Sequence, residues 1–168
     1  MNELSTGWKL FRTGAFIQMI LVILEFVFLA IQLGGFKNPL VGILLIIGYS
    51  VMFWFLYFGL SCLNNNYPDK PLSISQKNGF NRLFILNFFC IPVAFSEFLT
   101  VFRRLTTLPF HELSYSDPRI IYVILIGFYG LYFFVFHILY LIGMYRLRVL
   151  ITRNAEAQWD DFIKPDRQ

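Results

Sequence analysis

The sequence predicts an all-α integral membrane protein, a bundle of four transmembrane helices with short loops and a cytoplasmic C-terminal helical tail. Two observations lead to this fold class. Hydrophobic residues make up 57% of the 168 residues and charged residues only 14%, whereas an ordinary soluble domain carries about 25% charged residues. The chain also contains four long apolar runs, and none of them shows the strict alternation of a membrane barrel strand.

The same composition excludes several classes of protein. A soluble globule with so few charges could not cover its surface, and a disordered chain would not contain 20% aromatic residues. The net charge of +4 is explained by Lys and Arg beside a membrane, so we expect no nucleic-acid partner. The lipid bilayer is the first partner that the sequence predicts.

A transmembrane helix needs about 20 mostly apolar residues, and four runs meet this length. The predicted spans cover residues 13–35, 40–63, 83–102 and 120–145. Arg82 and Arg103 bound the third span, within which Pro92 removes one backbone donor. Arg119 and Arg146 leave 26 residues between them, about 39 Å of helix, so we expect the fourth span to tilt or protrude.

No repeat or linker divides the chain further, so residues 1–150 are predicted to form one four-span domain, followed by a tail over residues 151–168. Ser73 and Gln76 have the spacing of a capping box, which predicts a short cytoplasmic helix before the third span. The start of the tail is expected to extend the fourth helix.

The distribution of Lys and Arg predicts the orientation in the membrane. Four spans place both termini on one side. The termini and the middle loop carry ten basic residues, and the two opposite loops carry four. We therefore expect a multi-pass protein with both termini in the cytoplasm. The chain contains no Asn-X-Ser/Thr sequence, which agrees with a bacterial inner membrane.

Polar side chains inside the spans are the first candidates for function, because an ionisable group at the bilayer centre costs about 2.5–3.5 kcal/mol. They are Glu25, Asn87, Glu97 and His137. Ordered by depth, they form a ladder from Glu97 near the outer boundary, through Glu25 near the midplane, to the other two in the cytoplasmic half. One interpretation is a route for protons or cations. A second is the binding of a lipid or a small ligand. We favour a third, in which these groups satisfy one another and lock the helices.

Small residues in the second and fourth spans predict close helix packing. They are Gly42, Gly48, Ser50, Gly59, Gly127 and Gly130. The seam that they form lies either within the bundle or between subunits, and we expect a homo-oligomer.

Enzyme signatures are absent from the sequence, so we expect neither catalytic residues nor a cofactor nor a metal site. His111, Glu112 and Asp117 stand in the outer loop, too few and too widely spaced for zinc or calcium. A solvated loop is the better interpretation.

The C-terminal tail carries apolar side chains among acids, a pattern typical of a protein-binding segment rather than of a lipid-binding one. In a helix, Trp159, Phe162 and Ile163 share one face. Asp160 and Asp161 flank that face. We predict that these five residues dock a soluble cytoplasmic protein. The alternative is a tail that folds back under the bundle.

Together these patterns predict a non-enzymatic inner-membrane anchor or sensor subunit that oligomerises and recruits a cytoplasmic partner. Membrane sensors paired with a soluble effector are typical of envelope-stress and phage-defence (antiviral) systems, and this is the setting that we expect. The alternative function is a small oligomeric proton or cation channel, lined by the polar ladder.

Overall fold

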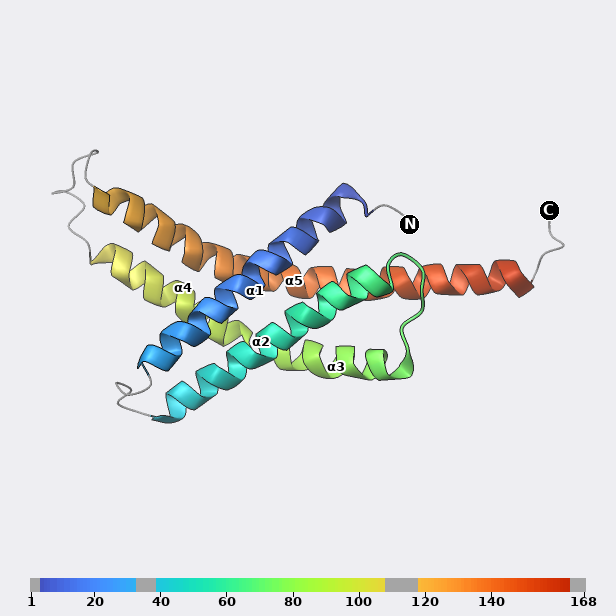
Figure 1. Ribbon diagram of the computed structural model, residues 1–168, viewed down its shortest axis with the longest axis horizontal. Coiled ribbons are helices and arrows are strands. Elements are labelled where there is room, and N and C mark those ends of the chain that lie inside the picture. The colour runs from blue at the N-terminus through green and yellow to red at the C-terminus, as the bar shows by residue number, and fades with distance from the viewer. Residues whose placement is uncertain (1–3, 33–38, 108–117, 164–168) are drawn as a thin grey trace.

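The computed structural model describes residues 4–32, 39–107 and 118–163, and these residues form α-helices and no strand. The helices are α1 (Thr6–Gln32), α2 (Pro39–Asn65), α3 (Ile74–Phe88), α4 (Ile91–Thr106) and α5 (Pro118–Ile163), arranged as Figure 1 shows. The all-α prediction is confirmed for this part of the chain.

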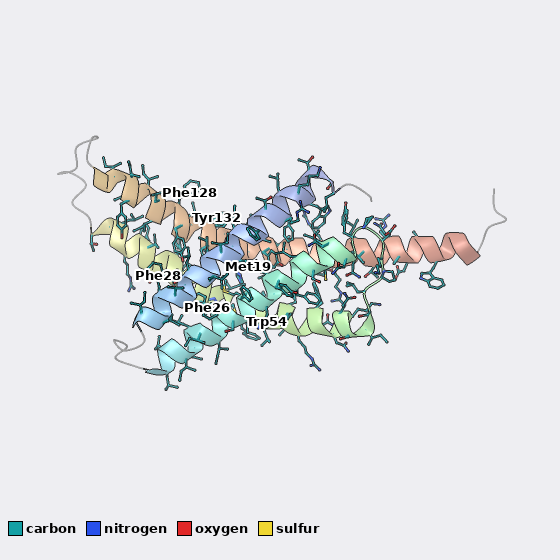
Figure 2. The ribbon with its side chains drawn as sticks, in the orientation of Figure 1. Met19, Phe26, Phe28, Trp54, Phe128 and Tyr132 are labelled. Carbon is teal, nitrogen blue, oxygen red and sulfur yellow. The ribbon has the colours of Figure 1, made fainter. Side chains whose placement is uncertain are left out.

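Four segments are long and apolar enough to cross a membrane, as predicted. They are Thr6–Ile31, Leu40–Asn65, Ile74–Arg103 and Ile120–Ala157. Large apolar side chains cover their outer surfaces: Phe28, Trp54 and Phe128, labelled in Figure 2, are 57%, 59% and 71% exposed. Soluble proteins rarely expose large contiguous apolar surfaces, so the fold indicates a multi-pass membrane protein.

The third segment consists of two helices instead of the single helix expected at residues 83–102. α3 begins at Ile74, well before Arg82, so no separate short helix precedes the span. The predicted capping box is present: Gln76 N donates to Ser73 Oγ over 3.2 Å, and Ser73 N donates to Gln76 Oε1 over 2.9 Å. The box therefore opens the third segment itself.

Pro92 explains the break between α3 and α4. It has no N–H to donate to the carbonyl of Phe88, and its ring would clash with that carbonyl in a continuous helix. α3 ends at Phe88, and α4 begins at Ile91 with Pro92 in its first turn. At the break, Cys90 N donates to Asn87 O over 3.1 Å. The lost donor is evident in the sequence, whereas the break that it causes is not.

α5 continues far beyond the expected end of the fourth span at residue 145. It contains 46 residues, about 69 Å of unbroken helix. No Gly or Pro occurs between Met144 and Lys164, so nothing in the sequence ends the helix where the apolar run ends. The extension of the fourth helix into the tail therefore reaches Ile163.

The helices pack as two pairs that cross. α1 packs against α2, α4 packs against α5, and α1 also contacts α5, which it crosses in Figure 1. Glycines let aromatic rings enter this crossing. The ring of Phe136 on α5 packs over Gly14 on α1, and the ring of Phe11 on α1 packs over Gly143 on α5. A Cβ atom at either glycine would overlap the ring from the other helix.

Tyr140 joins this crossing to α2. Its ring stacks on the ring of Phe11 with 5.1 Å between centroids and 1° between the planes. Its hydroxyl lies 3.0 Å from Phe55 O and 3.2 Å from Leu56 O, and donates to the backbone of α2. The same hydroxyl occupies the space that a side chain at Gly59 would need. One buried residue of α5 thus contacts both α1 and α2.

The small residues singled out in the sequence pack within this chain wherever the structure describes their neighbours. Gly48 faces Val93 and Gly130 faces Val101, both on α4. Gly59 faces α5. Their seam therefore lies inside the bundle, and the predicted homo-oligomer requires another surface.

We expect Gly59→Ala to destabilise the protein by about 1–3 kcal/mol, because the added methyl group would displace the Tyr140 hydroxyl from Phe55 O. Gly7→Ala is the matched control: nothing lies within 4 Å of a Cβ atom at that position, and Ala favours the helix by about 1 kcal/mol. Thermal unfolding in detergent measures both variants. Equal melting temperatures would contradict the role of Gly59 in this crossing.

Candidate functional site

The polar side chains of the spans gather in two hydrogen-bonded groups. The first group joins α2 to α4. Tyr49 is fully buried, and its hydroxyl donates to Glu97 Oε1 over 2.5 Å. Glu97 on α4 and Glu25 on α1 are both half-buried, and Glu25 lies within electrostatic range of the same hydroxyl. Both predicted carboxyl groups therefore lie near one tyrosine hydroxyl, and Glu97 accepts its hydrogen bond.

The second group joins α5 to α2 and to the break after α3. Asn87 and His137 are 1% and 3% exposed. With its hydrogen on Nε2, His137 donates to Asn87 O over 3.2 Å. Asn87 Nδ2 donates to Leu83 O over 2.9 Å and to Val51 O over 3.2 Å. The Asn87 carbonyl lies in the last turn of α3 and also accepts from Cys90 N over 3.1 Å, so His137 adds a second donor to a carbonyl at the break.

Phe133 on α5 connects the two groups. It is fully buried, packs edge-on against Tyr49 with 6.3 Å between ring centroids, and stands one turn before His137. An apolar ring of α5 therefore packs beside Tyr49, one turn from His137.

Gln18 and Tyr132 form interhelical hydrogen bonds that our sequence analysis did not predict. Gln18 on α1 is 1% exposed, and its Nε2 donates to Phe133 O over 3.3 Å. The Tyr132 hydroxyl donates to Gly14 O over 2.9 Å. Gln18 could have been predicted to form such a bond, because its amide lies inside the first apolar run. Nothing in the sequence distinguishes Tyr132 from the other aromatic residues of its span.

Three buried polar atoms have no hydrogen-bond partner among the described residues: Gln18 Oε1, Asn87 Oδ1 and the Tyr129 hydroxyl oxygen. The two amides are held through their NH₂ groups, which leaves their oxygens as acceptors inside the bundle. Tyr129 therefore offers a buried hydroxyl whose removal disrupts no described hydrogen bond.

The tip of α5, residues 156–163, is the second candidate site. Ala155 is the last residue described as buried, and Asn154 Nδ2 donates to Pro68 O over 2.9 Å, so α5 packs against the α2–α3 connection up to this point. Beyond it the helix projects away from the other helices (Figure 1), and Trp159 is 62% exposed.

The other predicted docking residues, Asp160, Asp161, Phe162 and Ile163, lie in the same helix, and their side chains are outside the described part of the chain. The described course of α5 is continuous through Ile163. It does not turn back at the start of the predicted tail.

The outer loop with His111, Glu112 and Asp117 lies outside the described residues. Within the residues that the structure describes, no three His, Cys, Asp or Glu side chains are placed to hold a metal ion. Cys62 and Cys90 are buried free thiols. The polar groups of the bundle and the tip of α5 are therefore the candidate sites of the described chain.

Comparison of the chain with protein-family models, with curated proteins and with solved structures found no match. The function is therefore inferred from the hydrogen-bonded polar groups of the bundle and from the tip of α5.

We expect Tyr49→Phe to destabilise the protein by about 1.5–3 kcal/mol, because it removes the hydrogen bond to the Glu97 carboxyl group. Tyr129→Phe is the matched control and should leave stability unchanged, because that hydroxyl has no partner among the described residues. Thermal unfolding in detergent and proton flux in liposomes are measured for both variants. A Tyr49→Phe protein that keeps its stability and loses proton flux would contradict helix locking and support a channel.

Proposed function

We propose that this chain is a non-enzymatic inner-membrane anchor or sensor subunit that recruits a soluble cytoplasmic protein through the tip of α5. One observation carries the proposal: α5 continues as a helix past its last buried contact and presents Trp159 with 62% of its surface exposed. Trp is enriched among the few residues that supply most of the binding energy at protein interfaces. An exposed ring at a projecting helix tip is suited to that role.

The distribution of charge supports an orientation in which this tip is cytoplasmic. Ten of the 14 basic residues belong to the two ends of the chain, up to Arg12 and from Arg146, and to residues 64–82, which include the connection between α2 and α3 and the first half of α3. The start of α1, the end of α2 and the tip of α5 point to the same end of the bundle (Figure 1). The positive-inside rule therefore favours a cytoplasmic location for both termini.

We expect a cysteine at Ser5 to react with a membrane-impermeant maleimide only after cells are permeabilised, and a cysteine at Thr106 to react in intact spheroplasts. Both positions are exposed, and they lie near the start of α1 and the end of α4. Replacing the buried Cys62 and Cys90 by Ala removes the background. Labelling of Ser5→Cys from outside would contradict the orientation.

The partner that fits the tip is a protein with an apolar pocket rimmed by Lys or Arg. The sequence spacing of Trp159, Phe162 and Ile163 is that of one apolar helix face, which would suit such a pocket. Glu156 is exposed one turn before Trp159, and two aspartates follow Trp159 directly in the sequence. The acidic surroundings favour a basic rim over an anionic membrane surface.

We expect Trp159→Ala to weaken binding of the docked protein about 30-fold, which corresponds to the loss of about 2 kcal/mol at a hot spot. A photo-reactive phenylalanine at position 159 identifies that protein in intact cells, and titration of the purified pair measures the affinity. Trp54→Ala removes the same ring from a similarly exposed position on α2, 59% against 62%, and should leave the affinity unchanged.

Equal affinities for the Trp159→Ala and Trp54→Ala variants would contradict docking at the tip. A cross-link from position 159 to another helix of the same chain would contradict it as well, because the tail would then fold back under the bundle.

An effector held at the membrane in this way suits an envelope-stress or antiviral response, and we propose that setting together with a homo-oligomeric anchor. Exposed apolar side chains on the spans, such as Phe28 and Phe128, offer surface for contact with lipid or with a second copy. A co-transcribed gene for a soluble protein would support the setting.

A proton or cation channel is the second candidate function. The observation that favours it is the presence of buried oxygens without a described partner, Gln18 Oε1 and Asn87 Oδ1, in a bundle that also contains Glu97 and His137. The pairing of Glu97 with Tyr49, and of His137 with Asn87, favours the anchor, because paired groups are explained by helix locking.

A further inference from the structure

A groove of about 320 Å³ lies between α1 and α2, on the outer surface of the bundle. Arg12, Thr13 and Phe16 of α1 line one wall, and Leu60 and Asn64 of α2 line the other. Arg12, Thr13, Phe16 and Asn64 are exposed, and Leu60 is half-buried. The groove belongs neither to the hydrogen-bonded groups of the interior nor to the tip of α5.

The position of the groove along the helices matches the boundary between the polar headgroups and the apolar core of a bilayer. Arg12 is the last basic residue before the apolar run of α1, and Asn64 is the first of the three asparagines that follow the apolar run of α2. α1 begins and α2 ends at the same end of the bundle, so the two polar positions face each other. Phe16 and Leu60 each lie one turn deeper on the same helices.

The lining of the groove is polar near the helix ends and apolar one turn deeper in the bundle. Arg12 supplies a guanidinium group, which binds phosphate through paired N–H donors, and Asn64 adds an amide. The Thr13 hydroxyl donates to Lys9 O over 3.1 Å, which fixes its oxygen at the groove wall. Phe16 and Leu60 provide hydrocarbon surface below. This order, phosphate donors above apolar side chains, is complementary to a phospholipid.

The other groove with arginines fits an anion less well. It is formed along α5 by Arg148, Arg153, Glu156 and three neighbours, so a carboxylate shares its lining. Arg148 is also engaged, because its Nη1 donates to Asn81 Oδ1 over 2.5 Å and its guanidinium lies 5.0 Å from the centroid of the Phe80 ring. None of the described residues that line the groove at Arg12 is acidic.

We propose that the groove between α1 and α2 binds one anionic phospholipid of the cytoplasmic leaflet. Its phosphate lies against Arg12 and Asn64, and the start of an acyl chain lies along Phe16 and Leu60. Basic sites between transmembrane helices on the cytoplasmic side favour anionic headgroups. The proposal rests on the membrane insertion and orientation given under the proposed function, and it does not depend on docking at α5.

Retention of lipid by the purified full chain tests the site. The protein is extracted in detergent from vesicles of equal phosphatidylglycerol and phosphatidylcholine with the same acyl chains, and bound lipid is counted by native mass spectrometry. We expect preferential retention of phosphatidylglycerol, and a loss of about fivefold in Arg12→Gln, the factor for one basic residue near an anionic surface. Arg153→Gln removes the same charge from the other groove and should retain lipid like the wild type.

Two further variants separate charge from fold. Arg12→Lys keeps the cation and should retain more phosphatidylglycerol than Arg12→Gln. Asn64→Leu removes the amide from the opposite helix and should also lower retention. The melting temperature of each protein is measured with and without phosphatidylglycerol. The increase should be larger for the wild type than for Arg12→Gln, and comparing the increases removes any difference in stability between the lipid-free proteins.

Equal retention by Arg12→Gln and Arg153→Gln would overturn the site, and so would equal retention of the two lipids by the wild type. Release of the bound lipid by millimolar inorganic phosphate would overturn the lipid as occupant and identify a general anion site. If Trp159→Ala loses the partner but Arg12→Gln retains phosphatidylglycerol like the wild type, the lipid site has failed and docking at α5 stands. If Arg12→Gln loses the lipid but Trp159→Ala keeps the partner, docking at α5 has failed and the lipid site stands.

Discussion

The close crossing of α1, α2 and α5 is the contact on which the rest of the bundle depends. Lipid tails are as apolar as the helix surfaces, so helices in a membrane associate through close packing and interhelical hydrogen bonds. Tyr140 supplies both, because its ring stacks on Phe11 and its hydroxyl donates to the backbone of α2 near Phe55. Gly59 leaves room for the hydroxyl, and Gly143 leaves room for the Phe11 ring. Without these two glycines, the three helices could not approach so closely.

The break before Pro92 imposes a second constraint, because the polar backbone at the end of α3 needs hydrogen-bond partners inside the bundle. It leaves the Asn87 carbonyl at the end of α3, and His137 reaches that carbonyl from α5. A polar residue inside the apolar run of α5 thus binds the backbone at the end of α3. Both side chains are buried, so the bond also selects which face of α5 meets α3. A substitution at the break that moves the Asn87 carbonyl would therefore disturb the packing of α5, although Asn87 and His137 are 50 positions apart in the sequence.

The two proposed binding sites, the tip of α5 and the groove between α1 and α2, lie at the same end of the bundle. α5 runs from the crossing to this end. Past Tyr140 the helix continues without a break, is braced by Arg148 on Asn81 and by Asn154 on Pro68 O, and then projects. A continuous helix held at two points gives its tip a defined direction. The groove between α1 and α2 lies at this same end, so an anchor of this kind would hold its partner close to the lipid surface.

The sequence by itself determined the all-α class, the four segments long enough to span a membrane, the capping box at Ser73 and the charge count behind the proposed orientation. These features depend on composition and on residues a few positions apart. It also identified Glu97, Asn87 and His137 as side chains that need partners. Only the tertiary structure decided that Tyr49 is the partner of Glu97, 48 residues away, and that His137 serves the Asn87 carbonyl, 50 residues away. Such pairs depend on how each helix is rotated and where it crosses its neighbours, and no local pattern in an apolar run specifies either.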